Sequence, residues 1–573
     1  MAKLPRGMIE ENLDKVIEMI KTNELSLPEL QRPSVWGSSK VPRLISSVYQ
    51  DYPFGIFLLW TPSPKDRIRC RPFAFQKSKG FDTTDTADHY LIDGQQRLTS
   101  FYRALHPDGD LSVVFNLKTQ DFSLADGRIR QMLLNPEEHH WYYLRDLLSL
   151  TMNEQHELLT RHADIGERKL ETIFGNKGKL WRLHPENIPI AIYNIQHKTY
   201  ADVAEIFERI NLGTPVRKSQ ILLGKLSAVY SGIVSEVEDY LANIRDRHGS
   251  RFNLDLFITA FSTIATDLAD IDRFEPRYLK EKPPVEKVQA DLKDTFTALD
   301  NALKFIDKYF YIDTFKYFRS ERTLIALAFL HHRFPDEVKD ESYCNRIAHW
   351  AYCSLLAGHH HDFNRLRRDL ATIRSLEEGE DPMTVPLKLM SNFEAGGTQE
   401  YLKWRIGILT DMESAISRNN LLCGVMYGLS RWKGAKSFKS LEPIRTVVID
   451  DSEDDEDVVD EKTVNELAIH EHHIYPRSLL VDEHEKGERW LTKEWIFDLG
   501  NFTFLTGRDN ILLQNPDIGY VIGLSDANKD AHMIGTANYM TGEYKKFLAD
   551  RRKLIQTRLG EFLDHLKTKA EEG

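Results

Sequence analysis

The stretch His470-Glu471-His472-His473-Ile474-Tyr475-Pro476 decides the fold of the C-terminal part of this 573-residue chain. Successive side chains of a strand point to opposite faces, so two adjacent histidines in a strand cannot serve one packed core, and their roles must differ. Downstream, Leu499-Gly500-Asn501 precedes the apolar run 502–505, and Asn510 follows Asn501 by nine residues. This order predicts a strand, a turn, a second strand and a helix that begins near Asp509.

These residues resemble the ββα-metal fold of HNH nucleases in the form found in the DUF1524 group, whose pattern is His-Ile-x-Pro, then Gly-Asn-Leu-Thr-Leu-Leu and a later Asn. The resemblance implies that His473 is the general base, that Asn501 is the central Asn of the catalytic motif, and that His472 and Asn510 bind a metal. A neutral imidazole and an amide oxygen make a weak, open site, which suits Mg²⁺ or Mn²⁺ held partly by water and by substrate phosphate. His473 would then take a proton from the attacking water.

Two other interpretations of the histidines stay open. They could form a surface cluster or a structural zinc site. The four cysteines are Cys70, Cys344, Cys353 and Cys423, so none lies near the histidines to support a zinc ribbon. The coincidence of His-His-x-x-Pro with Gly-Asn and a later Asn in the right order favours the nuclease.

A second informative stretch is Tyr90-Leu91-Ile92-Asp93-Gly94-Gln95-Gln96-Arg97-Leu98-Thr99. Here a strand ends in Asp-Gly and a helix begins directly, so backbone N–H groups and polar side chains gather at a helix N-terminus. This arrangement predicts an anion site. The simpler interpretation is a turn followed by a solvated helix residue.

The Asp-Gly-Gln-Gln-Arg block, together with Pro-Glu-Leu-Gln-Arg-Pro-Ser-Val-Trp at 28–36 and the block at 206–215, resembles the DUF262 family, a relative of the ParB and sulfiredoxin-like fold. The third block departs from the family spacing, because Gly213 follows Asn211 by only two residues. The resemblance implies that a nucleoside triphosphate (GTP, ATP or UTP) binds and is hydrolysed in some members. The implied nucleotide-binding residues are Gln31, Arg32, Asp93, Gly94, Gln95, Gln96, Arg97, Arg209 and Asn211.

Two basic segments are candidates for DNA binding. If the segment from Lys65 to Arg71 is a strand, its four basic side chains share one face and suit a phosphate backbone, although a charge-protected edge strand explains them equally well. The segment 431–439 interleaves basic and aromatic residues. The predicted DNA contacts are Lys65, Arg67, Arg69, Arg71, Arg431, Lys433 and Lys436.

The region between the DUF262-like segment and the DUF1524-like segment is predicted to be helical from about 225 to 440. His359-His360-His361 within it invites a metal interpretation, but a polar turn is favoured because consecutive helical residues face three directions. Nine of the twelve residues at 450–461 are acidic, which favours a solvated linker over a DNA mimic. Arg551 and Arg552 on the predicted last helix are expected to face away from the core or toward phosphate.

Composition limits the function classes. The content of 28% charged and 41% hydrophobic residues is ordinary for a soluble protein. Because the net charge is −12, any nucleic-acid binding must come from local basic patches. Because no long apolar run and no apolar signal segment occurs, we expect no membrane span and no secretory signal. Four scattered cysteines fit the reducing cytoplasm.

We therefore predict an α+β multidomain chain. Its parts are a ParB-like α/β nucleotide-binding domain (1–230), a helical domain (231–440), an acidic linker (441–462) and a ββα-metal nuclease domain (463–573). This order resembles single-chain type IV restriction proteins of the GmrSD kind, which implies a cytoplasmic, metal-dependent endonuclease that cuts double-stranded, modified phage DNA and is gated by a nucleotide. A homodimer stays open. The alternatives are a nucleotide-dependent DNA-binding or regulatory protein with a silent HNH site, and an RNase toxin.

Overall fold

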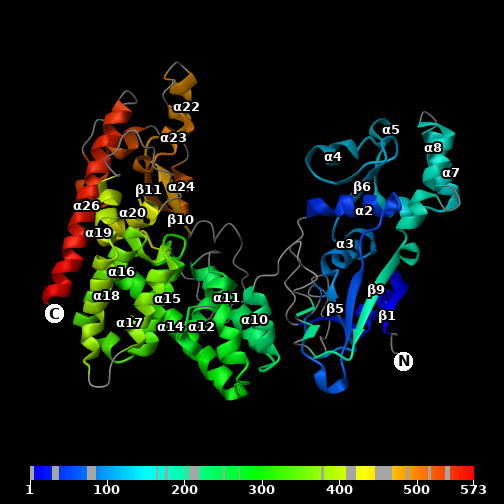
Figure 1. Ribbon diagram of the computed structural model, residues 1–573. Helices are drawn as coiled ribbons and strands as arrows, with labels where there is room; N and C mark the ends of the chain where they lie inside the picture. Colours follow the sequence, from blue (N-terminus) through cyan, green and yellow to red (C-terminus); the bar gives the residue numbers. More distant parts are fainter. Residues whose placement is uncertain are drawn as a thin grey trace. The chain divides into compact units, whose positions relative to one another are not determined.

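The computed structural model describes residues 6–28, 38–71, 73, 86–162, 165–174, 178–199, 202–203, 205–206, 218–248, 252–269, 271–375, 380–407, 421–445, 468–485, 488, 491–513, 518–535 and 543–572. The chain forms two compact units, Met1–Glu236 and Val237–Gly573. The first is mixed α/β, and the second is mostly helical (Figure 1). No helix within the described ranges is both long and apolar enough to cross a membrane.

The first unit is built on a six-stranded mixed sheet with the order β1-β9-β3-β5-β2-β4. β3 pairs with β9 in parallel and with β5 in antiparallel register, so these two strands flank β3 at the centre of the sheet. The strands are β1 (Gly7–Asn12), β2 (Leu25–Pro28), β3 (Phe57–Thr61), β4 (Cys70–Arg71), β5 (His89–Asp93) and β9 (Pro189–Gln196).

Alternation along β3 divides the apolar residues of the sheet between two faces. Phe57 and Leu59 join the large core, to which α1 (Leu13–Lys21), α2 (Val41–Tyr49) and α3 (Gln95–Leu105) contribute their buried sides. Leu58 and Trp60 join a smaller cluster with residues of β5 and β9. Among the described residues, fewer apolar side chains therefore pack on the face with Leu58 and Trp60 than on the face with Phe57 and Leu59.

The rest of the first unit surrounds a small second sheet with the order β7-β6-β8. Its strands are β6 (Val113–Asn116), β7 (Phe122–Leu124) and β8 (Trp141–Tyr143). The remaining helices are α4 (Gly127–Met132), α5 (Pro136–His139), α6 (Leu144–Ser149), α7 (Met152–Arg161), α8 (Glu167–Phe174) and α10 (Lys218–Ser227).

The condition for four basic side chains on one face, that 65–71 form a strand, is not met. Pro64–Asp66 is a single 3₁₀ turn, and only Cys70–Arg71 pairs as a strand, with β2. The Ser63 hydroxyl donates to the Asp66 carboxylate and closes the turn, so alternation cannot align the segment.

The second unit begins with a bundle of helices. The buried stripe of α14 includes Leu292, Leu299, Leu303 and Ile306, as the apolar spacing predicts, and its N-cap is Pro284. The helices are α11 (Ile233–His248), α12 (Leu254–Thr266), α13 (Ile271–Phe274), α14 (Val285–Phe310), α15 (Glu321–Arg333), α16 (Glu341–Ala357), α17 (Phe363–Arg374), α18 (Val385–Ala395), α19 (Thr398–Gly407) and α20 (Leu421–Trp432).

The predicted order of two strands and a helix near the C-terminus is confirmed. β10 pairs antiparallel with β11, from Ile469↔Thr506 to His473↔Phe502, and a helix follows directly because the Thr506 side chain caps it. The elements are β10 (Ile469–His473), α22 (Arg477–Glu485), α23 (Lys493–Ile496), β11 (Phe502–Thr506), α24 (Gly507–Leu512), α25 (Asp526–Ala531) and α26 (Tyr544–Glu572). Within this unit the Tyr317 ring packs edge-on against Phe504 of β11, which joins the helical bundle to the strand pair.

Two further expectations need correction. His359 and His360 are buried and not part of a polar surface turn, although His361 is exposed. Arg551 and Arg552 are each 1% exposed, so neither faces solvent or phosphate. The acidic run at 450–461 lies outside the described residues.

Candidate functional site

One face of β10 brings three polar side chains together. His470 and His472 are two residues apart on the strand and so point to the same side. Asn510, from the last turns of α24, meets both: its Oδ1 accepts a hydrogen bond from Nδ1 of His472 at 2.8 Å, and its Nδ2 donates to Nδ1 of His470 at 3.3 Å. The predicted metal pair is therefore in direct contact, with His470 as a third member that the sequence analysis did not single out. The i, i+2 spacing of a strand is the signal that would have found it.

His472 is the buried member of this group, at 6% exposure. Burial lowers the pKa of His472, while its hydrogen bond with Asn510 acts in the opposite direction. The imidazole is thus neutral near pH 7, the form that can bind a metal. Its Nε2 accepts a hydrogen bond from the Tyr520 hydroxyl at 2.8 Å. Because both ring nitrogens are engaged, metal binding through His472 must replace one of these bonds.

His473 lies on the opposite face, at the last residue of β10, and is partly exposed. Its ring packs edge-on against Phe502 and Phe497, with centroids 4.3 and 5.5 Å away. The adjacent histidines therefore differ in environment, as the strand argument requires. Aromatic rings on two sides fix the orientation of the His473 ring, and a fixed imidazole near solvent suits a proton acceptor.

Glu471 shares the face of His473 and ties β10 to the helical bundle. Its carboxylate accepts from the Tyr317 hydroxyl at 3.1 Å and pairs with Lys316 at 3.2 Å. Lys316 also donates to the backbone carbonyl of Ile469 at 3.2 Å. The strand that carries the histidines is thus anchored to the segment before α15.

Asn501 has no exposed surface and acts on backbone groups. Its Oδ1 accepts from the backbone N–H of Tyr475 at 2.8 Å, and its Nδ2 donates to the carbonyls of Tyr475 and Ile496 at 3.1 and 3.5 Å. These bonds fix the turn that follows His473. Asn501 therefore positions the end of β10, whereas the sequence analysis grouped it with the catalytic residues.

Two buried arginines of α26 hold the same region. Arg552 forms an ion pair with Asp498, and both side chains are almost fully buried. Arg551 donates to the carbonyls of Gly500, His532 and Met533. The two arginines therefore bind the loop before β11 and, through Arg551, the residues that follow α25.

The donor set of His470, His472 and Asn510 contains no carboxylate. Mg²⁺ prefers anionic oxygen ligands, whereas imidazole suits Mn²⁺ and later transition metals better. The residues fit a weakly held cation that takes its remaining ligands from water and substrate. Among the two predicted metals, this donor set fits Mn²⁺ better than Mg²⁺.

The predicted anion site of the first unit begins at Gly94, whose backbone has φ +105. A side chain here would also collide with the Phe57 ring, so the turn from β5 into α3 requires glycine. Arg97, one turn into α3, donates to the carbonyls of Phe54 and Ile56 at 2.8 and 3.0 Å and pairs with Asp93 at 3.0 Å. Burial lowers the pKa of Arg97, and the nearby Asp93 acts against this effect. Arg97 therefore fastens the helix to the loop before β3.

A cavity of about 450 Å³ lies beside Asp93. It lies on the face of the sheet that carries the smaller apolar cluster with Leu58 and Trp60. Its lining contains basic side chains and apolar side chains. Of the predicted nucleotide-binding residues, only Asp93 is among the lining, whereas Gln95 is buried. The lining residues are Arg6, Ile56, Leu58, Asp93, Tyr193, Asn194, Ile195, Gln196, Lys198 and Ile206.

The other nucleotide-binding predictions lie partly outside what the structure describes. Gln31, Arg32, Arg209 and Asn211 fall in segments that are not described. Gln96 is partly exposed in the first turn of α3. Arg6 and Lys198 were missed, since neither belongs to a motif.

The predicted DNA contacts have different environments. Arg431 pairs with Asp307 at 2.9 Å and with Asp313 at 3.5 Å, so two carboxylates already neutralise its charge. Lys433 lies over the Trp432 ring and 3.6 Å from Glu561, and Lys436 is exposed. In the first unit Arg67 pairs with Asp88, Arg69 is exposed and Arg71 is partly buried, while the Lys65 side chain is not described.

Comparison with known proteins identifies one part of the chain. Residues 13–227 match the family described as "GmrSD restriction endonuclease, N-terminal domain". This match confirms the GmrSD-like resemblance for that part, and it ends before the second unit begins. No match is found among curated proteins.

Proposed function

We propose that this chain is a restriction endonuclease of anti-phage defence whose C-terminal segment is an HNH-like nuclease. The match of residues 13–227 to the GmrSD restriction endonuclease N-terminal domain supports this proposal. The proposed substrate is double-stranded phage DNA that carries modified bases. The proposed reaction class is inferred from the family match, and the proposed catalytic residues lie in the second unit.

One observation carries the nuclease assignment. A strand, a second strand and a helix place His470, His472 and Asn510 in contact on one face of β10, with the partly exposed His473 at the end of the same strand. Metal-assisted phosphodiester hydrolysis needs a proton acceptor and metal-binding groups, and His473 and His472 provide them from adjacent positions on opposite faces of β10. This constellation supports a nuclease more directly than the fold alone does.

In the proposed mechanism His473 accepts a proton from a water molecule. The water oxygen forms a bond to phosphorus as the phosphodiester P–O bond breaks. Asn501 keeps His473 at the end of β10 through its bonds to Tyr475. A divalent cation held by His472 and Asn510, with His470 nearby, would stabilise the negative charge on the leaving oxygen.

We further propose that the cavity beside Asp93 binds the phosphates of a nucleoside triphosphate and that binding or hydrolysis gates cleavage. Its volume is within the range of small-molecule sites, and Arg6 and Lys198 add positive charge to its lining. Asp93 in this proposal interacts with phosphate through a bound cation or water, because two anions repel directly.

Nicking of supercoiled plasmid and of modified phage DNA tests the proposal, with Mn²⁺ or Mg²⁺ and with each nucleotide in turn. We expect Mn²⁺-dependent cleavage by the parent and none by His473→Ala, while His484→Ala on the adjacent α22 stays active. Because only a proton acceptor is removed, His473→Ala should bind DNA as tightly as the parent. Equal nicking by the parent and His473→Ala would overturn the nuclease assignment.

A second candidate is a nucleotide-dependent DNA-binding regulator with a silent nuclease site. Its support is that both ring nitrogens of His472 are engaged in hydrogen bonds. It predicts nucleotide-dependent DNA binding without cleavage under any metal. Cleavage of RNA in place of DNA in the same assay would instead identify an RNase.

A further inference from the structure

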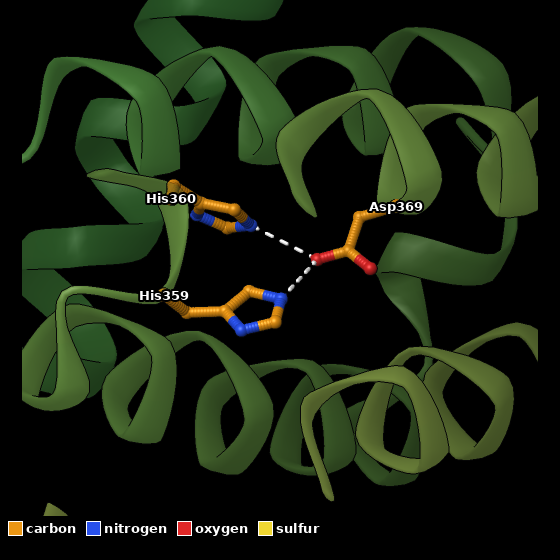
Figure 2. A group of neighbouring side chains, drawn as sticks. All are labelled: His359, His360 and Asp369. Carbon is orange, nitrogen blue, oxygen red and sulfur yellow. Dashed lines mark hydrogen bonds and ion pairs between the residues drawn. The ribbon is translucent and has the colours of Figure 1, made fainter. Parts of the chain in front are cut away.

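A second histidine cluster lies inside the helical bundle, far along the chain from β10. His359 and His360 sit on the 3₁₀ turn His359–His361 between α16 and α17, and Asp369 lies on α17. His359 and His360 are 1% exposed, and Asp369 is fully buried. Figure 2 shows both imidazoles directed at one carboxylate oxygen: Nε2 of His359 and of His360 lie 3.1 and 3.0 Å from Oδ2 of Asp369.

Further hydrogen bonds orient these side chains from two other helices. Thr323 of α15 places its hydroxyl 2.9 Å from Nδ1 of His360. Asn392 of α18 donates to the other carboxylate oxygen of Asp369 at 3.1 Å. Outer contacts of this kind fix the tautomer and orientation of metal-binding histidines and carboxylates. The cluster therefore has both converging donors and a supporting shell.

Hydrogen bonds alone leave the cluster incompletely satisfied. Nδ1 of His359 has no hydrogen-bond partner within the described part of the chain. Asp369 is a fully buried carboxylate, and a buried anion is stable only when it is paired with a cation or coordinates a metal.

We propose that His359, His360 and Asp369 bind a divalent transition metal, with zinc the best match. Two imidazole nitrogens and one carboxylate oxygen suit zinc and give one negative charge, unlike the neutral donors on β10. Ligands about 2.0–2.1 Å from a tetrahedral zinc lie about 3.3 Å apart, so the observed contacts need to open by only a few tenths of an ångström.

The site stabilises the bundle and takes no part in catalysis. Its ligands are buried, so substrate cannot reach the metal, and a water molecule takes the fourth position. Through the ligands and their partners Thr323 and Asn392, the metal joins α15, α17, α18 and the turn before α17. These helices belong to the same compact unit as β10 and β11.

Metal analysis of the full chain tests the proposal. All samples carry His472→Ala, so that the donors on β10 do not contribute. After incubation with zinc and desalting, we expect about one zinc per chain in this parent and in the exposed control His361→Ala. We expect no stoichiometric zinc in Asp369→Asn, and about 10–100-fold weaker zinc binding in Thr323→Val, which loses only an outer contact.

X-ray absorption of the zinc-loaded parent gives a measurement that does not depend on folding of the variants. Nitrogen and oxygen ligands with imidazole scattering would support the site, whereas sulfur ligands would place the zinc on cysteine and overturn it. A parent without stoichiometric zinc, or equal zinc in folded Asp369→Asn, would also overturn the proposal. Chelation should lower the melting temperature of the parent and leave that of Asp369→Asn unchanged.

Discussion

Asn501 and His473 belong to one sequence motif but have different physical roles. Asn501 makes buried hydrogen bonds to the backbone of Tyr475 and Ile496, and His473 packs its ring against Phe497 and Phe502. Removal of the Asn501 side chain leaves these buried backbone groups without hydrogen bonds. Removal of the partly exposed His473 ring breaks none of the hydrogen bonds that Asn501 makes.

The prediction is that Asn501→Ala lowers the free energy of unfolding by about 2–4 kcal/mol, while His473→Ala lowers it by less than about 1 kcal/mol. Both variants should lose cleavage. Urea unfolding of each variant, beside nicking assays, separates the two roles. Equal stability of the two variants would contradict the positioning role of Asn501.

His532 offers a prediction on pH. Burial lowers its pKa to about 4, because the ring has no access to solvent, and this effect outweighs the hydrogen bond to the carbonyl of Lys436, which raises the pKa. The other ring nitrogen lies 2.6 Å from the Thr503 hydroxyl. In the unfolded chain the pKa returns to about 6.5. The folded state therefore binds fewer protons, so the stability due to His532 is complete above about pH 6.5 and is lost as pH falls toward about 4.

We expect the second unit to lose about 2 kcal/mol of stability between pH 7.5 and pH 5 from this residue alone. His532→Gln should unfold at a lower urea concentration than the parent at pH 7.5, but with a smaller pH dependence. The exposed His361→Gln is the matched control and should keep the parent's dependence. An unchanged pH slope in His532→Gln would show that other groups are responsible.

Residue types were easier to predict than residue environments. The histidines and Asn510 were identified from order and spacing alone, because the chemistry of their side chains limits their roles. The partners of the arginines could not be predicted: Arg431 binds Asp307, which lies 124 residues away in the sequence. Arg551 and Arg552 likewise look like surface charge in the sequence and are buried in the structure.

At the scale of elements, the sequence predicted those strands and helices whose formation depends on residues close together in the chain. The ββα order near the C-terminus follows from alternation and from the Thr506 cap, and both can be recognised in the sequence. The alternating charges from Lys65 to Arg71 would share one face only in a strand, and the 3₁₀ turn Pro64–Asp66 prevents that alignment. The cavity beside Asp93 was also not predicted, since its lining comes from the three strands β3, β5 and β9 and from residues outside them that are distant in the sequence.

Near the cavity beside Asp93, Arg97 and Lys198 are expected to have different roles: Arg97 stabilises the fold, and Lys198 binds the nucleotide. Arg97 bridges α3 to the loop before β3, so Arg97→Ala should lower the free energy of unfolding of the first unit by about 2–4 kcal/mol. Lys198 lines the cavity and is exposed. Lys198→Ala should leave stability within about 0.5 kcal/mol of the parent but weaken the binding of a labelled nucleoside triphosphate by about tenfold or more.

Calorimetric unfolding and fluorescence titration of both variants measure these two effects. Lys118→Ala, an exposed lysine outside the cavity lining, is the control for a change of charge. If Lys198→Ala binds the nucleotide as tightly as Lys118→Ala does, the cavity is not the phosphate site.

At the scale of the whole molecule, the chain divides between a unit in which residues 13–227 match the GmrSD N-terminal domain and a unit with the candidate nuclease residues. If the proposed function is correct, the nuclease must stay inactive on host DNA, and a segment of the chain that blocks DNA binding would restrain it. The acidic run at 450–461 lies in the sequence between α20 and β10, both of which belong to that unit. A tethered segment meets its neighbours at an effective concentration that can reach the millimolar range.

The last prediction tests whether this run competes with DNA for basic groups. Lys436 is exposed after α20, and the nine acids would attract such groups when DNA is absent. Replacement of the acids by Ser and Gly at constant length should then raise affinity for unmodified DNA and raise unprompted nicking. Both effects should shrink as salt rises, because the competition and DNA binding depend on screened charges. Nicking of unmodified plasmid at low and moderate salt measures this, with a length-matched variant that keeps every acid and changes only Ser452, Val458 and Val459. Equal rates for the two variants at both salt concentrations would mean that the run is only a spacer.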